Sequence, residues 1–355
     1  MAKYKVGILG LGKMGKVYTR WFAAHPLCEV AGVYNRTREK AKAALDYAPD
    51  AVIYDSWEQL ADDQQIDMVG ICSPSDVRLA QVARCIKNGK HVIGEKPFCM
   101  DVDEMHKMIA LAKNTEAKVY VASQLKEHAV SRAMYGLLET IGPVLHMRYA
   151  FNMYRLASDR WKYKLESGGG ILRELCGHYI DMVQTWFGPA RAVYGYNLIG
   201  LDAREVEDMS ETFIEFEAGQ TVHITSNYWE RGTKRYAGRV VGKNGQMDYA
   251  YSPYDVRDSK IVLYTDDGVR DVPLKMPDDI DDIYPGNINT FKIEIDKFVD
   301  AVEKDLDVMH TLALEMATMQ IIDASYLSTK TDKKIILPLK SYDSSKMLEG
   351  SYKRL

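Results

Sequence analysis

The 355-residue sequence lacks the features that mark several large classes of protein. It has no long uncharged apolar run, so we expect no segment to span a bilayer. Its 46 basic and 50 acidic residues give a formal net charge of −4, which provides no electrostatic basis for binding nucleic acid or an anionic membrane. Its N-terminus runs directly into a strand pattern and leaves no room for a signal peptide. It contains no internal repeat and no low-complexity linker.

Cysteine is scarce, and its spacing excludes two common frameworks. The five cysteines are odd in number and form no Cys-x-x-Cys pair, so neither a disulfide framework nor a zinc site is indicated. We interpret Cys28, Cys72, Cys85, Cys99 and Cys176 as small buried residues of a reduced protein. The expectation is a cytoplasmic protein without a bound metal.

What the sequence does contain is enough chain for two domains. Over residues 1–122, short apolar runs alternate with helical patterns, which predicts a doubly wound parallel sheet. Residues 123–340 are expected to form an α+β domain, with residues 341–355 as a tail. The strands predicted in residues 123–340 are joined by short turns such as Lys243-Asn244-Gly245. This pattern favours a large, mostly antiparallel sheet with one open face.

A Gly-rich loop, Gly10-Leu11-Gly12-Lys13-Met14-Gly15, directly follows the first apolar run and precedes a helical pattern. Strand, loop and helix in this order predict a dinucleotide site. Gly10 permits the tight turn, Gly12 lets the backbone approach a pyrophosphate, and Gly15 allows close contact between helix and strand. Backbone amides and the helix dipole would then hold the anion.

The end of the second predicted strand bears on the choice of cofactor. An enzyme that uses NAD usually has an acidic residue there to bind the ribose 2′-hydroxyl, whereas this chain has Asn35, Arg36 and Arg38. Guanidinium groups suit a phosphate dianion, so the pattern favours NADP(H), with NAD(H) as the alternative. The competing interpretation is that both arginines lie on a solvated helix without a role.

Two further segments carry a plausible acid–base set. Gly94-Glu95-Lys96-Pro97 supplies a cation, and the segment from Gly168 to His178 opens a predicted helix, Gly170 to Trp186. On that helix Glu174, His178 and Asp181 stand at i, i+4 and i+7, which places them on one face. For an isolated histidine, a structural role would be the better interpretation.

These motifs together resemble the glucose–fructose oxidoreductase, inositol dehydrogenase and rhizopine catabolism family of two-domain sugar and polyol dehydrogenases. The matching stretches are Gly10 to Gly15, Ser73-Pro74, Gly89 to Val92 leading into Glu95-Lys96-Pro97, and Gly168 to Asp181. The resemblance covers essentially the whole chain, and it implies a Rossmann domain followed by a substrate domain.

The resemblance implies that Lys96 contacts the substrate oxygen and the nicotinamide ribose, and that His178 is the general acid–base, with Glu174 in place of the family's Asp. These roles agree with the chemistry, because imidazole accepts a proton near neutral pH and an ammonium stabilises an alkoxide. A second departure is Arg78, where relatives often carry His. The predicted cofactor-binding residues are Gly10, Gly12, Lys13, Met14, Asn35, Arg36, Arg38, Ser73, Pro74, Glu95, Lys96 and Gln124.

The expected substrate is a sugar, a polyol such as an inositol, or a sugar derivative, oxidised at a secondary hydroxyl or reduced at a ketone. Aromatic faces and fixed donors hold such molecules. The predicted substrate-binding residues are Lys96, Tyr154, Arg155, Trp161, Lys162, Glu174, His178 and Tyr284. A homodimer or homotetramer is expected from the open sheet face. The alternative function is a non-catalytic regulator that keeps the fold and senses a nucleotide or sugar.

Overall fold

The chain divides into two compact units. The computed structural model describes residues 3–154, 161–200, 205–231, 235–251, 259–274, 290–339 and 350–354. The first unit comprises Met1–Ser123 and Phe291–Met316, and the second comprises Gln124–Thr290 and Ala317–Leu355. The segment 291–316, which the sequence analysis assigned to the second domain, therefore belongs by its contacts to the first unit.

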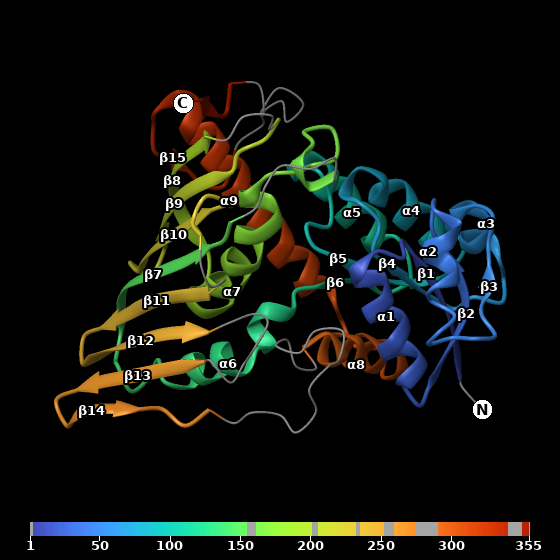
Figure 1. Ribbon diagram of the computed structural model, residues 1–355, viewed down its shortest axis with the longest axis horizontal. Helices are drawn as coiled ribbons and strands as arrows, with labels where there is room; N and C mark the ends of the chain where they lie inside the picture. The colour runs from blue at the N-terminus through green and yellow to red at the C-terminus, as the bar shows by residue number, and fades with distance from the viewer. Residues whose placement is uncertain are drawn as a thin grey trace. The chain divides into compact units, whose positions relative to one another are not determined.

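The first unit contains a parallel sheet with the strand order β3-β2-β1-β4-β5-β6, shown in blue to green in Figure 1. Its strands are short, and β4 and β6 are buried along their whole length, as parallel strands covered on both faces should be. From β1 the order runs in opposite directions, to β2 and to β4, which confirms the predicted doubly wound fold. The strands are β1 (Tyr4–Leu9), β2 (Cys28–Tyr34), β3 (Val52–Ile53), β4 (Met68–Ile71), β5 (His91–Glu95) and β6 (Val119–Ala122).

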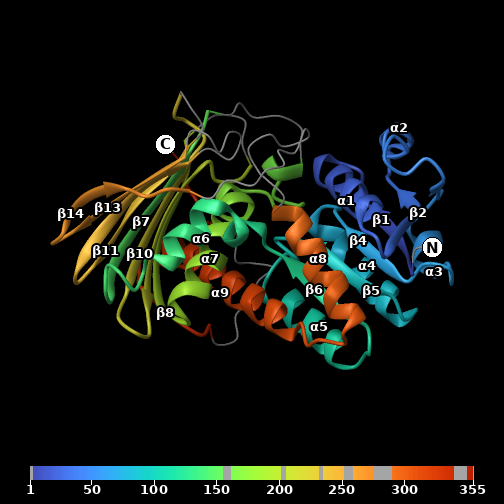
Figure 2. The same cartoon turned by 90° about the horizontal axis from the view of Figure 1, so that it is seen from below.

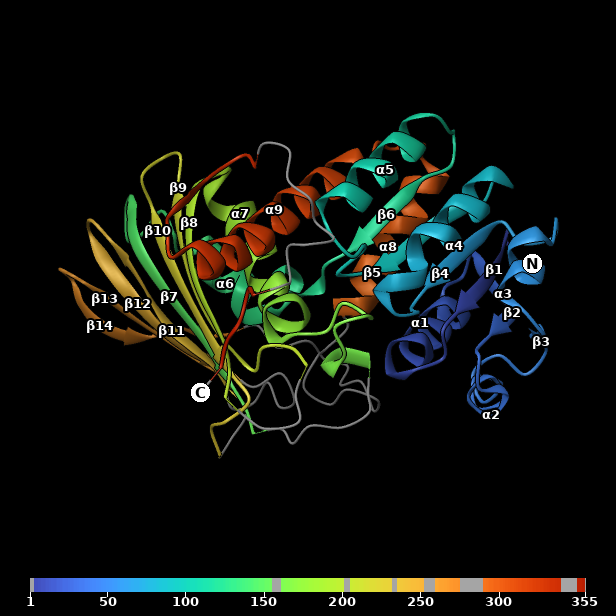
Figure 3. The same cartoon turned by 90° about the horizontal axis from the view of Figure 1, so that it is seen from above.

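Helices cover this sheet. The helix α4 packs against both α3 and α5, and Figure 3 shows α4 and α5 side by side. Helix α5 begins where it does because Asp101 accepts a hydrogen bond from the amide of Glu104, and Glu104 accepts one from the amide of Met100. The helices of this unit are α1 (Lys13–Ala24), α2 (Arg38–Lys42), α3 (Trp57–Asp62), α4 (Ser75–Lys87), α5 (Val102–Lys113) and α8 (Thr290–Glu303), with the start of α9 (Met309–Thr331).

Specific contacts explain why segment 291–316 joins the first unit. In α8, the Phe298 ring lies 6.4 Å from Phe22 of α1 and 6.1 Å from Tyr120 of β6, and α8 lies beside α1 in Figures 1 and 2. The buried carboxylate of Glu294 accepts a 3.0 Å hydrogen bond from the Tyr120 hydroxyl. Glu315 accepts one of 2.8 Å from the amide of Phe98. Apolar and polar contacts thus both hold this late segment against the first part of the chain.

The second unit is built on a mostly antiparallel sheet with the order β14-β13-β12-β11-β7-β10-β9-β8-β15, which confirms the predicted architecture. Within it β10 pairs parallel to β7, and β16 pairs parallel to β8. The end of the expected tail is therefore part of the sheet. The strands are β7 (Val144–Asn152), β8 (Ala190–Ile199), β9 (Met209–Phe216), β10 (Thr221–Asn227), β11 (Arg235–Gly242), β12 (Gly245–Tyr251), β13 (Lys260–Thr265), β14 (Gly268–Asp271), β15 (Ile335–Ile336) and β16 (Lys353–Arg354).

One face of this sheet carries the core of the unit. Along β9 and β10, alternate residues are buried, which is the pattern of strands with one covered face. Helices α6 (Ala129–Gly136), α7 (Gly177–Phe187) and the later part of α9 lie on this face (Figure 2). The ring of Tyr179 from α7 packs 4.1 Å from that of Tyr149 on β7. Among the described residues, no helix has the length and hydropathy needed to cross a membrane.

The start of the long helix differs from the prediction. The residues Leu172–Cys176 form a π-helical stretch that leads into α7, rather than one continuous α-helix from Gly170. Its signature is a hydrogen bond from the amide of Gly177 to the carbonyl of Leu172, five residues back. A wider turn rotates successive side chains differently from an α-helix. The predicted i, i+4 alignment of Glu174 and His178 therefore does not have ideal α-helical geometry.

Candidate functional site

Two of the loop glycines are required by the packing of the nucleotide loop. Gly10 has a φ of +90°, and a Cβ there would lie 2.6 Å from the amide nitrogen of Ser73. A Cβ on Gly15 would lie 2.0 Å from the carbonyl oxygen of Gly10. No larger side chain fits at either position without moving the backbone. The loop after β1 is therefore pressed against both α1 and the end of β4.

Gly12 has a different environment, since a Cβ on it would meet no atom within 4 Å. Gly12 is also the residue before α1, whose first turn has no side-chain cap, and Lys13 at its start is exposed. An open backbone at an uncapped helix start is what a phosphate group requires for close approach. Gly10, Gly12, Lys13 and Met14 thus fit a dinucleotide pyrophosphate.

The loop is braced by the end of β2. The Asn35 side chain accepts a 2.8 Å hydrogen bond from the amide of Leu11 and donates one of 3.0 Å to the carbonyl of Thr37. Arg36 is exposed and makes no hydrogen bond or ion pair with any described residue. Arg38, at the start of α2, pairs with Asp55. Among the described residues, the guanidinium of Arg36 thus has no ion-pair partner, whereas that of Arg38 is paired with a carboxylate.

A buried arginine ties together the ends of β4 and β5. Arg78 is 3% exposed and donates hydrogen bonds to the carbonyl oxygens of Ser73, Glu95 and Pro97. Arg78 stands where relatives often carry His, and its guanidinium is bound to backbone carbonyls within the first unit. Its role is to fix the turn that carries Lys96, a half-buried residue, and the Ser73-Pro74 turn before α4.

Glu95 precedes Lys96 and is itself buried. Burial raises the pKa of Glu95 to about 7, and the nearby Arg78 cation acts in the opposite direction. The Tyr18 hydroxyl and the Lys96 cation further favour the charged form, while Glu294 disfavours it. The carboxyl of Glu95 therefore gains or loses its proton near neutrality. It lies at the end of β5, the edge that also carries Lys96.

In the second unit, Glu174 is the centre of a polar cluster. The Tyr228 hydroxyl donates a 2.6 Å hydrogen bond to Glu174 Oε2, and Lys162 forms an ion pair with Glu174 Oε1. The side chains of Lys162 and Glu174 are only 20% and 12% exposed, so the carboxylate is held by groups that compensate for its partial burial. The structure thus brings together Lys162 and Glu174, which the sequence predicted, and adds Tyr228.

The other members of the predicted stripe lie on the same helix. His178 is half-buried in the first turn of α7. Asp181, 4% exposed, forms an ion pair with Lys126 at 3.4 Å. An acid, an imidazole and two lysines are therefore concentrated around the π-helical stretch and the start of α7. Such stretches occur frequently at functional sites.

A buried carboxylate anchors the start of this helix. Glu207 is fully buried and accepts hydrogen bonds from the amide of Leu172 at 3.0 Å and the hydroxyl of Tyr326 at 2.8 Å. Burial raises the pKa of Glu207 to about 7. Arg173 follows Leu172 in the chain, and its guanidinium lies 3.6 Å from the carboxylate of the buried Asp323. This network fixes the turn from which Glu174 projects.

The remaining predicted residues have varied environments. The Arg231 guanidinium lies 4.1 Å from the centre of the Tyr154 ring and donates a 3.1 Å hydrogen bond to the Tyr154 hydroxyl. Trp161 begins a short 3₁₀ turn, Trp161–Tyr163. Gln124 is buried and is the first residue of the second unit. Arg155 and Tyr284 lie outside the described residues.

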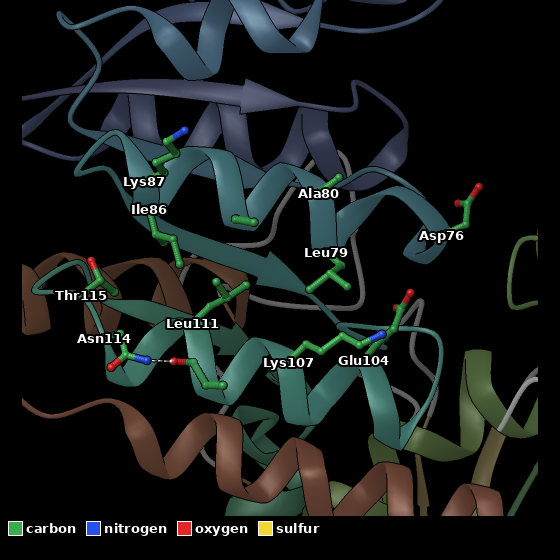
Figure 4. A pocket seen from close by; sticks show the side chains of 12 residues that line it. Asp76, Leu79, Ala80, Ile86, Lys87, Glu104, Lys107, Leu111, Asn114 and Thr115 are labelled. Carbon is green, nitrogen blue, oxygen red and sulfur yellow. Dashed lines mark hydrogen bonds between the residues drawn. The ribbon is translucent and has the colours of Figure 1, made fainter. Parts of the chain in front are cut away.

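A large groove of the first unit contains none of the predicted site residues. It has a volume of about 1040 Å³ and lies between α4 and α5 (Figure 4). Apolar side chains such as Leu79 and Leu111 form its floor, and charged ones such as Lys87 and Glu104 its rims. Over the described part of the chain, no group of three or more His, Cys, Asp or Glu side chains could hold a metal ion.

The doubly wound sheet and the open glycine loop of the first unit are typical of an oxidoreductase that binds a nicotinamide dinucleotide. Residues 4–123 match the model of the oxidoreductase family with an NAD-binding Rossmann fold, and residues 138–248 match that of the GFO/IDH/MocA C-terminal domain. The chain belongs to the GFO/IDH/MocA family of oxidoreductases. It is an NAD(P)-dependent enzyme of a family that acts on CH–OH groups of sugars and polyols.

Among curated relatives, the chain is 27% identical over 277 residues to scyllo-inositol 2-dehydrogenase (NADP(+)) IolW of Bacillus subtilis, which covers 75% of this chain and 70% of that protein. It is 24% identical over 341 residues to inositol 2-dehydrogenase of Rhizobium meliloti, which covers 93% and 98% of the two chains.

Solved structures of similar fold include levoglucosan dehydrogenase in complex with NADH and levoglucosan. Its TM-score is 0.84 at 21% identity, covering 95% of this chain and 100% of that one. An oxidoreductase from Agrobacterium radiobacter in complex with NAD+, L-tartaric acid and magnesium gives 0.81 at 15% identity, covering 94% and 98%. These similarities support the fold of both units.

Proposed function

We propose that this enzyme is an NADP(H)-preferring dehydrogenase or reductase that acts on a secondary hydroxyl or ketone of a sugar, a polyol such as an inositol, or a sugar derivative. The observation that carries the proposal is the cluster in which Lys162 and Tyr228 hold Glu174, four residues before His178 on one helix. A fixed carboxylate one turn of the helix before an imidazole suits a polyol, which presents several hydroxyl groups to be oriented.

The residues divide the chemistry between them. A bound nicotinamide supplies the hydride acceptor for alcohol oxidation, or the donor for ketone reduction. His178 takes up the hydroxyl proton in oxidation and returns it in reduction. Lys96 stabilises the negative charge that develops on the substrate oxygen. Glu174, held by Lys162 and Tyr228, orients the imidazole or binds a neighbouring substrate hydroxyl.

The preference for NADP(H) is supported by Arg36 and Arg38 and by the absence of an acid at the end of β2. One relative is named for NADP(+), whereas the two structures described above contain NADH or NAD+, so similarity alone gives no preference. Changing both arginines to alanine should weaken NADP(H) binding by about 2–4 kcal/mol and spare NAD(H). Equal losses for both cofactors would refute this assignment.

We propose a homodimer or homotetramer formed through the outer face of the second unit's sheet. Tyr194 and Tyr196 on β8 are 47% and 39% exposed on this face, and a hollow of about 630 Å³ lies over β7 and β10. Large exposed aromatic side chains on a sheet face are typical of an interface. Size-exclusion chromatography with light scattering at micromolar concentration should show a dimer or tetramer, and a clean monomer would contradict the proposal.

The decisive experiment is an absorbance assay of NAD(P)H with a panel of sugars, inositols and keto-sugars. On the substrate so identified, His178→Ala should lower kcat by roughly 10²–10⁴-fold with little change in nucleotide affinity. A variant that retains near wild-type kcat would show that the base lies elsewhere. Nucleotide binding without turnover of any compound would favour the alternative, a non-catalytic sensor with the same fold.

A further inference from the structure

An acidic residue that follows β3 engages one of the two arginines after β2. The Nη1 of Arg38 lies 2.6 Å from Oδ1 of Asp55. Both side chains are more than half exposed, 54% for Arg38 and 77% for Asp55, so each is accessible to a ligand in solvent. The residues at the end of β2 include no acid, and the fold supplies one from the segment that follows the neighbouring strand β3.

The backbone fixes Asp55 at this edge. Strand β3 runs parallel to β2, with Gly32 opposite Val52 and Val33 opposite Ile53, so the residues after both strands come to the same edge of the sheet. Tyr54 continues the pairing through its amide, which donates to the carbonyl of Val33 at 3.0 Å. The amide of Asp55 donates to Gln59 Oε1 at 3.2 Å. Asp55 therefore stays at the edge even when Arg38 turns away.

We infer that Asp55 sets how strongly the enzyme discriminates between NADP(H) and NAD(H). The inference rests on the proposed function, in which Arg36 and Arg38 receive the 2′-phosphate. A phosphate dianion would have to displace Asp55 from Arg38 and would also meet its negative charge. A 2′-hydroxyl meets no such repulsion, and a carboxylate can accept its hydrogen bond. Asp55 thus restrains NADP(H) binding and leaves NAD(H) binding unaffected or favours it.

The effect should be moderate and dependent on salt. An exposed ion pair contributes little stability, so releasing Arg38 costs the fold almost nothing. The repulsion between a carboxylate and a dianion some 7 Å apart in a watery site corresponds to about a five- to tenfold change in affinity at low ionic strength. In about 1 M salt the Debye length is near 3 Å, and the change should shrink to less than about twofold.

The test is the variant Asp55→Asn, with dissociation constants for NADPH and NADH measured by fluorescence titration in the absence of substrate. Asp55→Asn should bind NADPH about five- to tenfold more tightly at low salt, with NADH unchanged or weaker. The matched control is Glu116→Gln, which makes the same charge change at an exposed residue just before β6, at the opposite edge of the sheet. It should alter neither constant.

In an Arg38→Ala background, Asp55→Asn should give a smaller gain, since there is no guanidinium left to release. An Asp55→Asn variant that binds NADPH no more tightly than the wild type, or that strengthens both nucleotides equally, would overturn the inference. A wild type that binds NADH more tightly than NADPH would refute the proposed cofactor preference. A shift of the two dissociation constants in favour of NADPH in Asp55→Asn would still support the role of Asp55. A wild type that binds neither nucleotide would overturn both.

Discussion

Glu207 offers a sharp test of how the helix that carries Glu174 and His178 is held. The change is Glu207→Gln, which keeps one oxygen to accept the hydrogen bonds from Leu172 and Tyr326. The second oxygen, Oε2, is buried without a hydrogen-bond partner among the described side chains and backbone groups, so an amide nitrogen in its place breaks no hydrogen bond seen there. The buried amide donors cost the variant some stability at every pH, whereas its stability should depend on pH differently from that of the wild type because it has no charge to bury.

The expected effect follows from the pKa of Glu207, which burial raises from 4.5 to about 7. The folded state therefore binds a proton between about pH 4.5 and 7 that the unfolded state has already released, so the unfolding free energy falls as pH rises through this window. Between pH 5 and 8 this group alone removes about 2–3 kcal/mol. Glu207→Gln has no carboxyl group to titrate at this position. Between pH 5 and 8 its unfolding free energy should therefore rise by about 2–3 kcal/mol relative to that of the wild type.

The assay is urea unfolding followed by tryptophan fluorescence at a series of pH values from 5 to 8. Because other titrating groups contribute equally to both proteins, the difference between variant and wild type isolates Glu207. The control is Glu217→Gln, an exposed acid in the turn after β9, for which the difference should stay flat. A flat difference for Glu207→Gln as well would show that the carboxylate is ionised in the folded protein, and the reasoning would be wrong.

Three further predictions concern the two parts of the site. Gly12→Ala should leave the unfolding free energy within about 1 kcal/mol of the wild type but weaken NADPH binding at least about tenfold. Gly15→Ala should instead lower the unfolding free energy by about 1–3 kcal/mol. Urea unfolding and NADPH titration of both variants measure these effects. Tyr228→Phe removes a hydrogen bond to Glu174 worth about 1.5–3 kcal/mol, so kcat/KM should fall about 10–100-fold, and an unchanged value would place Glu174 outside the chemistry. Lys96→Ala should lower kcat by roughly 10²–10³-fold in the steady-state assay, and a change in KM alone would contradict its proposed role.

Much of the fold could be predicted from local pattern. The loop from Gly10 to Gly15 follows a buried strand and opens a helix, and each of these signals lies within a few residues of the next. The alternation of β9 and β10 similarly reveals a sheet with one covered face. The assignment of 291–316 could not be predicted, because it depends on contacts such as Phe298 with Phe22, which lie hundreds of residues apart.

The candidate site was predictable only where the motif itself carries the chemistry. Lys162 and Glu174 were identified by residue type, and the structure joins them. Tyr228 was missed because a tyrosine at the end of an alternating strand reads as an ordinary strand residue. The partners of Arg78 could not be predicted, because no local pattern reveals that its guanidinium binds the carbonyls of two strand ends. Asp55 reaches Arg38 only because β3 lies beside β2.

The division of the first unit between residues up to Ser123 and the segment from Phe291 to Met316 has a consequence for synthesis. A chain leaving the ribosome exposes the apolar surface of Phe22 and Tyr120 long before Phe298 is made. At about 5–20 residues per second, the nucleotide-binding unit waits on the order of ten seconds or more for its last helices. The nascent enzyme must therefore keep an incomplete domain soluble during that interval. A fragment ending at residue 123 should for the same reason be a substrate for chaperones rather than an independent nucleotide-binding protein.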